Sequence, residues 1–372
     1  MATYDLGYLG GGQLARMSIQ AAQRMGLRCL SLDPGEVTPA SQISPAIQGA
    51  LDDPSAIAEV FSSCEFVTLE NEFIPATAIR SALSKAGRPA SVLIPGVETL
   101  EVIQDKLTQR LAYARAGVSS PYAVSLGDGG VRAKAEIGFP MVLKARFGGY
   151  DGKGTRTALT EEDFEQYRPL WAAGGWLAES FVPFRRELAV MVVRSGAVER
   201  TFATVESVQT NHVCDLVFPC GADASAIAIA AVRAVGGQGL YGVELFEDQD
   251  GQFSVNEIAP RPHNSGHYTM DGWSASQFQV HVAAVVGLAL PSLVEFRPVI
   301  MANLLGVEGA NEWRTALHDI EDENVRLHWY GKAESRPGRK MGHLNYLCSD
   351  GSVENHVQHV ISLREKFLSA WR

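Results

Sequence analysis

The chain has 372 residues, of which 46% are hydrophobic, so it carries enough apolar material for two or three packed domains. Its net charge of −10 disfavours nonspecific nucleic-acid binding, which needs a broad basic surface. No apolar run approaches the roughly 20 residues that span a bilayer, and MATYDLGYLGGG lacks the features of a signal segment. The five cysteines include no CxxC pair. We therefore expect a globular cytoplasmic protein that binds neither nucleic acid nor membrane.

The first third of the chain has the pattern of a parallel α/β domain. Residues 4–32 predict a βαβ unit, in which an apolar strand is followed by the turn GYLGGGQLARM, an amphipathic helix and the strand LRCLSLDP. A further strand, EFVTLE, leads to the acidic residues Glu70 and Glu72, and a helical stretch follows from about 98 to 116. We expect an open parallel α/β domain over residues 1–117.

Beyond residue 117 the chain changes to short strands and glycine loops, which favours two α+β lobes. In the smaller lobe, expected over 118–184, PMVLKARFGGYDGKGTRTA predicts a hairpin with a basic connection. The larger lobe, expected over 185–372, has the strand-rich segments ELAVMVVRSGAVERTFATVES and YGVELFEDQDGQFSVNEIAPRP, with an alanine-rich helix near 223–236 between them. Later helices are expected near 275–288 and 354–370.

The first glycine-rich loop is an ambiguous phosphate site. Gly7, Gly10, Gly11 and Gly12 precede a helix whose N-terminus favours an anion, but their spacing differs from the dinucleotide fingerprint. A structural turn, a substrate site and a dinucleotide site all stay open, and Asp33 lies near the acidic position that a dinucleotide site requires.

The second loop, GGYDGKG, has a richer composition and follows a strand that carries Lys144 and Arg146. Its glycines allow closure over a triphosphate, Lys153 neutralises phosphate charge, and Asp151 accepts a proton or orients an amine. The alternative is a solvated hairpin turn. A third segment, ESFVPFRREL, offers backbone groups for an adenine edge and a carboxylate, Glu187, for ribose hydroxyls; the alternative is a strand with a charged turn.

Glu244 and Glu257 lie in apolar strands joined by the turn EDQDGQ. A hairpin places them side by side, and two such carboxylates repel unless a cation lies between them. Mg²⁺ accepts carboxylate and phosphate oxygens, and Asn256 adds a neutral oxygen nearby. The alternative is that one glutamate faces solvent, as strand alternation allows.

Two further segments carry polar clusters. The loop RPHNSGH is either a surface turn or an oxyanion clamp beside the metal, formed by Arg261, His263 and Asn264. Nearer the C-terminus, a basic cluster is either a phosphate clamp or a solvated face, and it consists of Lys332, Arg339 and Lys340.

In this order, the segments resemble those of the ATP-grasp superfamily, and specifically its N5-carboxyaminoimidazole ribonucleotide synthetase family. The similarity runs nearly end to end. It rests on GGGQLARM at 10–17, Asp105, Lys106, Lys144, GGYDGKG, ESFV, Arg186, Glu187, NEIAPRPHNSGHYT at 256–269 and GKAESRPGRKMGH at 331–343. The last two segments are highly specific.

The resemblance implies a three-domain ATP-grasp fold, α/β and α+β, with an N-terminal pre-ATP-grasp domain and ATP between two α+β lobes. It also implies a reaction of purine biosynthesis. Bicarbonate attacks the γ-phosphate of ATP to give carboxyphosphate, which carboxylates the exocyclic amine of 5-aminoimidazole ribonucleotide and leaves ADP and phosphate. The implied cofactor is Mg²⁺, with Mn²⁺ as an alternative. A homodimer and a functional coupling to the downstream mutase are further expectations.

The resemblance assigns roles residue by residue. ATP is expected to contact Lys106, Lys144, Gly149, Tyr150, Asp151, Gly152, Lys153, Gly154, Thr155, Glu179, Ser180, Phe181, Val182, Glu187, Asn256 and Glu257. The metal is expected at Glu244 and Glu257. Carboxyphosphate and the amine are expected among Tyr150, Asp151, Lys153, Arg261, His263 and Asn264. The ribonucleotide is expected to contact Gln13, Glu70, Glu72, Arg261, Lys332, Arg339 and Lys340.

One stretch departs from the family pattern. Where relatives often have ENxH, the chain has ESVQ, which puts Ser207 and Gln209 at the asparagine and histidine positions of a nucleotide contact. Two alternatives stay open: His212 replaces that contact, or the contact is absent. Three other functions were weighed: formate-dependent glycinamide ribonucleotide formylation, a dinucleotide oxidoreductase, and a regulatory nucleotide-binding module without turnover. The RPGRKMGH segment argues against the first, and the complete set of metal and phosphate residues argues against the last.

Overall fold

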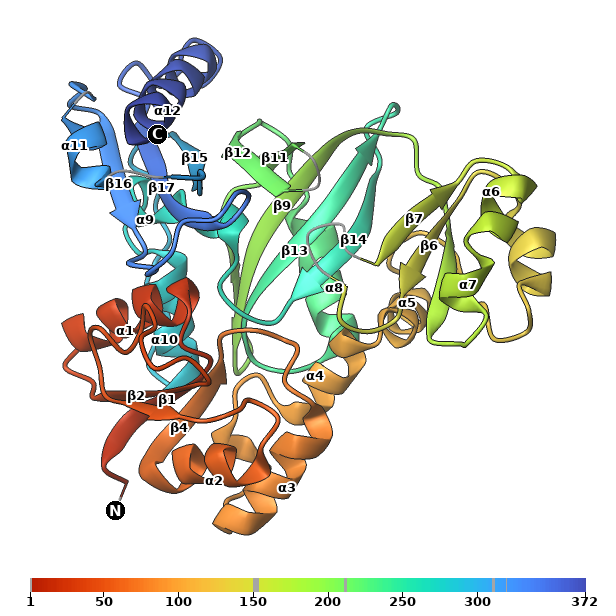
Figure 1. The fold of residues 1–372 in the computed structure, drawn as a ribbon, viewed down its shortest axis with the longest axis horizontal. Helices are drawn as coiled ribbons and strands as arrows, with labels where there is room; N and C mark the ends of the chain where they lie inside the picture. Colours follow the sequence, from red (N-terminus) through yellow and green to blue (C-terminus); the bar gives the residue numbers. More distant parts are fainter. Residues whose placement is uncertain (1, 150–153, 211–212, 310–311, 319) are drawn as a thin grey trace.

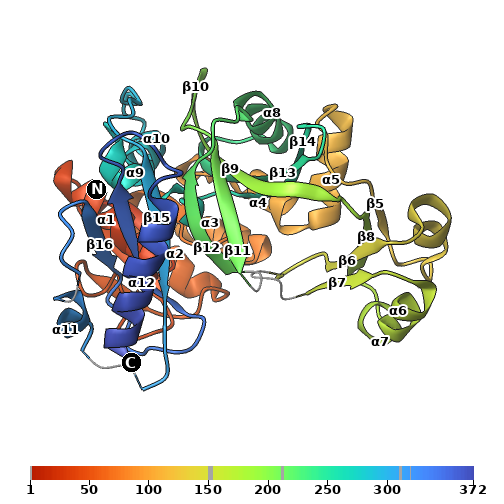
Figure 2. The same ribbon diagram turned by 90° about the horizontal axis from the view of Figure 1, so that it is seen from above.

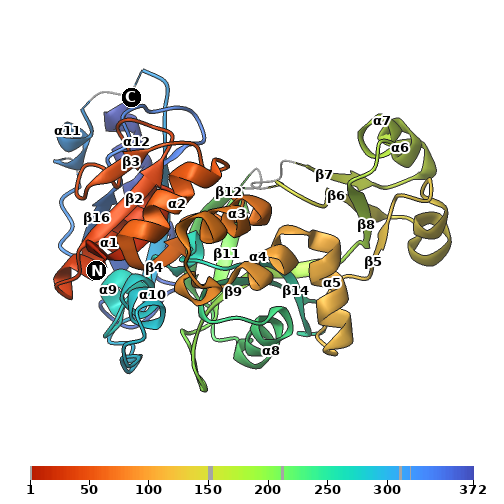
Figure 3. The same cartoon turned by 90° about the horizontal axis from the view of Figure 1, so that it is seen from below.

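The computed structural model describes residues 2–149, 154–210, 213–309, 312–318 and 320–372. These residues form three sheets (Figure 1). The N-terminal sheet lies on one side of a large central sheet, and a small lobe projects from the other side, as the two perpendicular views show (Figures 2 and 3).

The N-terminal sheet has the strand order β3-β2-β1-β4, and all its pairs are parallel. Its elements are β1 Tyr4–Leu9, α1 Gln13–Arg24, β2 Cys29–Asp33, β3 Ala46–Gln48, α2 Pro54–Ser63, β4 Cys64–Leu69 and α3 Ala76–Ala86. Alternation along β1 sends Leu6 and Tyr8 toward α1 and Leu9 toward α2 and α3. The α1 face is completed by α10 (Gln277–Val285), which returns from much later in the chain. The predicted open parallel α/β domain is confirmed.

The helical stretch expected from about 98 to 116 is two helices rather than one, α4 (Val97–Gln104) and α5 (Lys106–Arg115). Asp105 is extended, and its carboxylate accepts hydrogen bonds from the backbone N–H of Leu107 and from the guanidinium of Arg146. The predicted helical stretch is confirmed, and it is divided at Asp105 because this capping aspartate, held by a distant arginine, ends α4 there.

The small lobe is built on an antiparallel sheet with the order β5-β8-β6-β7. Its elements are β5 Ala123–Ser125, β6 Met141–Ala145, β7 Thr155–Ala158, α6 Glu161–Gln166, α7 Arg168–Trp171 and β8 Trp176–Ser180. Phe164 and Trp171 fill its core, with ring centroids 4.7 Å apart. The hairpin predicted for PMVLKARFGGYDGKGTRTA corresponds to β6 and β7.

The central sheet follows the order β14-β13-β9-β11-β12-β15-β17-β16, with β10 paired to β9. Its strands are β9 Phe184–Ser195, β10 Val198–Thr201, β11 Val205–Thr210, β12 Val213–Pro219, β13 Gly239–Asp248, β14 Phe253–Ala259, β15 Val299–Leu305, β16 Val325–Trp329 and β17 Lys340–Leu347. The C-terminal segment therefore shares a sheet with the large lobe. The boundaries at 117 and 184 stay predictions.

Helices cover the central sheet unevenly. The helix α8 (Ser225–Val235) packs on one face of β9, β13 and β14, whereas α10 covers only part of the opposite face. The helices α11 (Trp313–Leu317) and α12 (Val357–Trp371) pack near β15, β16 and β17. Within the described ranges, no helix has the length and apolar character needed to cross a bilayer.

Candidate active site

The two glutamates expected to bind metal lie opposite one another on neighbouring strands. Glu244 of β13 is in register with Glu257 of β14, and both are partly buried. Val243 and Leu245 point to the other face, where they pack against α8. Glu187 of β9 shares the face of Glu244, since it pairs with Phe246 two residues along β13. This face is left open by α10, so three carboxylates meet at an accessible end of the sheet.

A β-bulge at Asn256 gives Glu257 its orientation. The register moves from Glu244 opposite Glu257 to Leu245 opposite Val255, so Asn256 is the additional residue. Val255 and Ile258 both lie in the core under α8, although regular alternation over three residues would place them on opposite faces. Without the bulge, Val255 and Glu257 would lie on the same face of β14. Either the carboxylate would then lie in the apolar core under α8, or the valine would leave that core.

The bulge is held by Arg110 of α5. Its guanidinium donates to the carbonyl oxygens of Val255 and Asn256 at 3.1 and 2.7 Å, which satisfies backbone groups beside the disrupted ladder. Arg110 is buried and pairs with Glu179 of β8 at 2.7 Å. Sequence reasoning missed Arg110, because a single arginine within a helix carries no motif that reveals a partner 145 residues away.

Glu179 connects this network to the small lobe. Its carboxylate also pairs with Lys144 of β6 at 2.9 Å, and the Lys144 ammonium donates to Asn256 Oδ1 at 3.3 Å. Burial alone would raise the pKa of Glu179, but Arg110 and Lys144 outweigh it and lower that pKa to about 2. The Glu179 carboxylate is therefore committed to two cations, and its predicted contact with adenine stays a prediction.

The charges around the glutamate pair are asymmetric. Burial, and then the charges of Glu257 and Glu187, raise the pKa of Glu244 to about 8. Burial also opposes ionisation of Glu257, but the ammonium of Lys106 contacts its carboxylate and lowers that pKa below the usual value. One carboxylate thus resists ionisation while its neighbour is stabilised by a cation, as expected for two acids that share a site.

This donor set fits a hard divalent cation. Two carboxylates and the amide oxygen of Asn256 lie together, and Mg²⁺ is usually held by one or two carboxylates with phosphate and water oxygens completing its shell. Within the described ranges, no group of three or more His, Cys, Asp or Glu side chains is arranged to hold a metal ion. The site therefore suits a metal that arrives with other ligands better than an all-protein cage.

The RPHNSGH loop lies next to this pair. His263 Nε2 is 3.7 Å from Glu244 Oε1. The His263 side chain lies so close to Gly242 that a Cβ at Gly242 would come within 2.5 Å of His263 Cβ and 2.8 Å of the ring carbon Cγ. Burial, and then Arg261 and Lys340, lower the pKa of His263 to about 3, so its imidazole is neutral at pH 7. Gln277 of α10 fixes the loop through hydrogen bonds with the backbone of His263.

The other two polar residues of the loop are also held by distant partners. Arg261 pairs with Glu72, which ties the loop to the N-terminal domain. The side-chain amides of Asn264 and Asn303 exchange two hydrogen bonds, of 3.0 and 2.6 Å. Asn303 of β15 is buried and also donates to the carbonyl of Cys214 at 2.8 Å. No motif in the sequence points to this asparagine.

The predicted substrate residues of the N-terminal domain and the C-terminal strand lie close together. Glu70 accepts a hydrogen bond from the backbone N–H of Leu14 at 3.3 Å, at the start of α1, and burial raises its pKa to about 7. Burial, and then Arg339, lower the pKa of the Lys332 ammonium to about 8, and Glu70 opposes that shift. The structure thus brings together Glu70, Lys332 and Arg339. For Gln13, which opens α1, the expected ligand contact stays a prediction.

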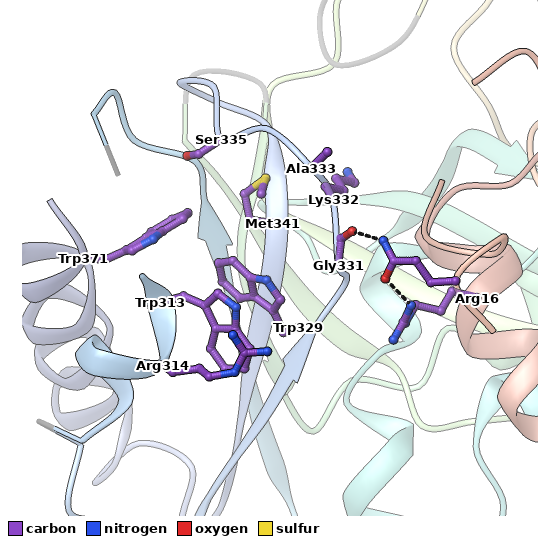
Figure 4. A pocket seen from close by; sticks show the side chains of 11 residues that line it. Arg16, Trp313, Arg314, Trp329, Gly331, Lys332, Ala333, Ser335, Met341 and Trp371 are labelled. Carbon is purple, nitrogen blue, oxygen red and sulfur yellow. Dashed lines mark hydrogen bonds between the residues drawn. The ribbon is translucent and has the colours of Figure 1, made fainter. Parts of the chain in front are cut away.

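A pocket of about 500 Å³ adjoins this region (Figure 4). Lys332 lies at its edge, and Gln42 Nε2 donates to the carbonyl of Gly331 at 2.6 Å, which joins the N-terminal domain to the C-terminal strand. Trp313 and Trp329 stack in the pocket with centroids 5.0 Å apart. No pattern in the sequence points to this pocket, since its walls come from five segments that lie far apart in the chain.

The structure places the remaining predicted residues as follows. Gly149 and Gly154 lie on either side of residues 150–153 in the sequence, Gly154 accepts a hydrogen bond from Ala145 N–H at 2.8 Å, and Thr155 is in register with Lys144. Tyr150, Asp151, Gly152, Lys153 and His212 lie outside the described residues. Ser180, Phe181 and Val182 follow in sequence at the end of β8, with Phe181 exposed. Gln209 of β11 donates to Ser207 Oγ at 2.9 Å.

Family models match three segments of the chain. Residues 1–104 match the ribonucleotide synthetase preATP-grasp domain, residues 112–278 the ATP-grasp domain, and residues 299–354 the phosphoribosylaminoimidazole carboxylase C-terminal domain. With the three sheets and the carboxylate pair, these matches define an enzyme of the ATP-grasp class. The predicted fold class is confirmed.

Relatives that match over nearly the whole chain identify the family within the ATP-grasp class. The chain is 36% identical to the N5-carboxyaminoimidazole ribonucleotide synthase of Synechococcus elongatus, over 98% of this chain and 95% of that protein. An ADP complex of an N5-carboxyaminoimidazole ribonucleotide synthetase superposes with a TM-score of 0.88 at 32% identity, covering 100% and 99% of the two chains. The Aspergillus clavatus synthase in complex with ADP and 5-aminoimidazole ribonucleotide gives 0.87 at 28%, covering 98% and 99%. The chain belongs to the N5-carboxyaminoimidazole ribonucleotide synthase family.

The buried network predicts a stability effect for Arg110→Met. The substitution leaves two carbonyls unpaired and the Glu179 carboxylate with one cation fewer, and we expect a loss of about 3–5 kcal/mol in the free energy of unfolding. Urea unfolding followed by fluorescence measures it. Arg80→Met, which removes an exposed pair with Glu101, is the matched control and should leave the midpoint nearly unchanged. Equal effects of the two substitutions would contradict the role of Arg110.

Proposed function

We propose that this chain is a carbon–nitrogen ligase that carboxylates 5-aminoimidazole ribonucleotide at its exocyclic amine, with bicarbonate as the carbon source and ATP hydrolysed to ADP and phosphate. Membership of the synthase family over nearly the whole chain supports this reaction. The observation that carries it is the register pair Glu244 and Glu257, which faces the lysines and the RPHNSGH loop.

ATP binds, in this proposal, across the carboxylate pair with its phosphates toward Lys106 and Lys144. Glu244 and Glu257 would hold Mg²⁺, or Mn²⁺ in its place, and the ion would supply positive charge that neutralises the nucleotide phosphates. Glu187 binds the ribose, and the backbone of residues 179–182 binds the adenine, with Gln209 as a peripheral nucleotide contact. The segment 149–155 closes over the phosphates and excludes water.

The carboxyl group is transferred in two steps. A bicarbonate oxygen attacks the γ-phosphorus, and ADP leaves; the carboxyphosphate formed then delivers its carbon to the amine, and inorganic phosphate leaves. Arg261 and Asn264 stabilise the negative charge on the oxygens of carboxyphosphate. Both side chains are held in position for this by partners outside the loop. His263 is neutral and donates or accepts a hydrogen bond without adding charge. Tyr150, Asp151 and Lys153 complete the site when the segment closes.

The ribonucleotide binds between the N-terminal domain and β17. Lys332, Arg339 and Lys340 supply positive charge for its 5′-phosphate. Glu72 is paired with Arg261, which leaves Glu70 and Gln13 for the imidazole and ribose. With a pKa of about 7, Glu70 presents both a proton donor and an acceptor near neutral pH.

The biological setting is part of the same proposal. The protein acts in the cytoplasm as a homodimer, on small molecules rather than on nucleic acid or membranes. Its carbamate product passes to the mutase that follows in purine biosynthesis.

A coupled assay of ADP release tests the reaction directly. We expect turnover only when bicarbonate and 5-aminoimidazole ribonucleotide are present together, because carboxyphosphate is discharged productively by the amine. Omission of either substrate is the control. Turnover supported instead by formate and glycinamide ribonucleotide would contradict the proposal, and so would binding of a nicotinamide dinucleotide.

Glu257→Gln tests the metal role. The amide is nearly isosteric but has no charge for the cation, so turnover should fall by roughly 10²-fold or more in a protein that still folds. Steady-state rates at saturating ATP and Mg²⁺ measure the effect. The matched control is Asp250→Asn, the same chemical change at an exposed position of the turn that joins the two strands, and it should retain full activity. An unchanged rate for Glu257→Gln would rule out its part in the metal site.

Arg339→Ala tests the phosphate clamp. Loss of one charged hydrogen bond to the 5′-phosphate should raise the KM for the ribonucleotide by about 10-fold or more and leave the KM for ATP nearly unchanged. Arg336→Ala, at an exposed arginine three residues earlier that pairs with Glu334, should leave both constants unchanged. Equal increases in both KM values for Arg339→Ala would contradict the clamp.

A further inference from the structure

Lys106 already supplies a cation to the carboxylate pair. It is the first residue of α5, and its backbone N–H donates to the carbonyl of Arg146 at 3.0 Å, which fixes where its side chain begins. Its side chain is only 17% exposed, and its ammonium contacts Glu257 Oε1. The preceding Asp105 is not its counterion, since that carboxylate pairs with Arg146.

The neighbouring cations have other partners. Arg110 is neutralised by Glu179 and donates to the bulge carbonyls, and Lys144 pairs with Glu179 and with the amide oxygen of Asn256. Among the described residues, Lys106 therefore forms its ion pair with a proposed metal ligand, Glu257. The ion pairs of Arg110 and Lys144 are instead with Glu179, which is not a proposed metal ligand. The three cations are close in space but differ in what they neutralise.

A lysine ammonium and a divalent ion cannot both lie against the same carboxylate without strong repulsion. For the metal to reach Glu257, Lys106 must move away, and in the ligand-free protein its ammonium would then lack a partner in a largely buried position. When the phosphates of a nucleotide are present, the ammonium gains an anionic partner close by. The same phosphates also provide the metal with ligands beyond those that the described residues offer.

We propose that Lys106 occupies the cation position at Glu257 in the ligand-free protein and yields it to the divalent ion only when nucleotide phosphates take up its ammonium. The inference rests on the proposed function, because it assumes that Glu244 and Glu257 are the metal ligands and that ATP is the nucleotide. The inference adds that Lys106 excludes free divalent ions from the site when no nucleotide is bound. Metal and nucleotide then enter together, and neither a bare metal ion nor an unpaired carboxylate occupies the site between turnovers.

Binding of Mn²⁺, measured as loss of the free-ion signal in electron paramagnetic resonance, tests the exchange without turnover. The wild-type protein should bind Mn²⁺ weakly alone and much more tightly with a nonhydrolysable ATP analogue. Lys106→Met should bind Mn²⁺ alone about 10-fold more tightly than the wild type, because the competing charge is gone. The ATP analogue should increase the Mn²⁺ affinity of Lys106→Met by a smaller factor than it increases that of the wild type. Lys106→Gln is the second variant, in case the first fails to fold.

Lys134→Met is the matched control, since it removes an equal charge from the small lobe, where the ammonium pairs with Glu161 and Glu165 rather than with Glu257. Its affinity for Mn²⁺ alone should stay close to that of the wild type. The proposal is overturned if Lys106→Met and Lys106→Gln bind Mn²⁺ no more tightly than the wild type, or if Lys134→Met gains as much Mn²⁺ affinity as they do. If Mn²⁺ fails to bind the wild-type protein even with the ATP analogue, the metal pair of the proposed function is wrong instead.

Discussion

The structure depends on one electrostatic constraint: two carboxylates, Glu244 and Glu257, face each other across neighbouring strands at the open end of the central sheet. Such a pair is unstable unless a proton or a cation separates the charges. In the ligand-free protein, the raised pKa of Glu244 and the ion pair between Glu257 and Lys106 together meet that requirement. At this pair we propose that a divalent ion binds together with phosphate oxygens.

The surrounding architecture maintains this pair. A bulge turns Glu257 away from the core under α8, and Arg110 satisfies the backbone that the bulge disturbs. Arg110 pairs with Glu179, and Glu179 also pairs with Lys144. Through these ion pairs, α5, the small lobe and the central sheet are joined in one buried network. Arg261 and its partner Glu72 connect the same site to the N-terminal domain. The distances between lobes are thus set partly by charge pairs and not by apolar packing alone.

The features of the fold and the site that could be predicted from the sequence are those that depend on local patterns. The turn between two apolar runs predicted the β13–β14 hairpin and the neighbouring glutamates, and the parallel N-terminal sheet followed from its βαβ pattern. What could not be predicted depends on contacts between distant segments. Neither the bulge at Asn256 nor the partnership of Asn264 with Asn303 has a sequence signature. The helix break at Asp105 was missed because the capping aspartate is also stabilised by Arg146, 41 residues later.

The most direct measurement is an anomalous-scattering map of crystals grown with Mn²⁺ and a nonhydrolysable ATP analogue. The account predicts a peak between Glu244 and Glu257, roughly 2.1 Å from an oxygen of each, with the Lys106 ammonium moved from Glu257 to a phosphate. A peak bound to nucleotide alone, or to one glutamate with Lys106 still on Glu257, would contradict the account.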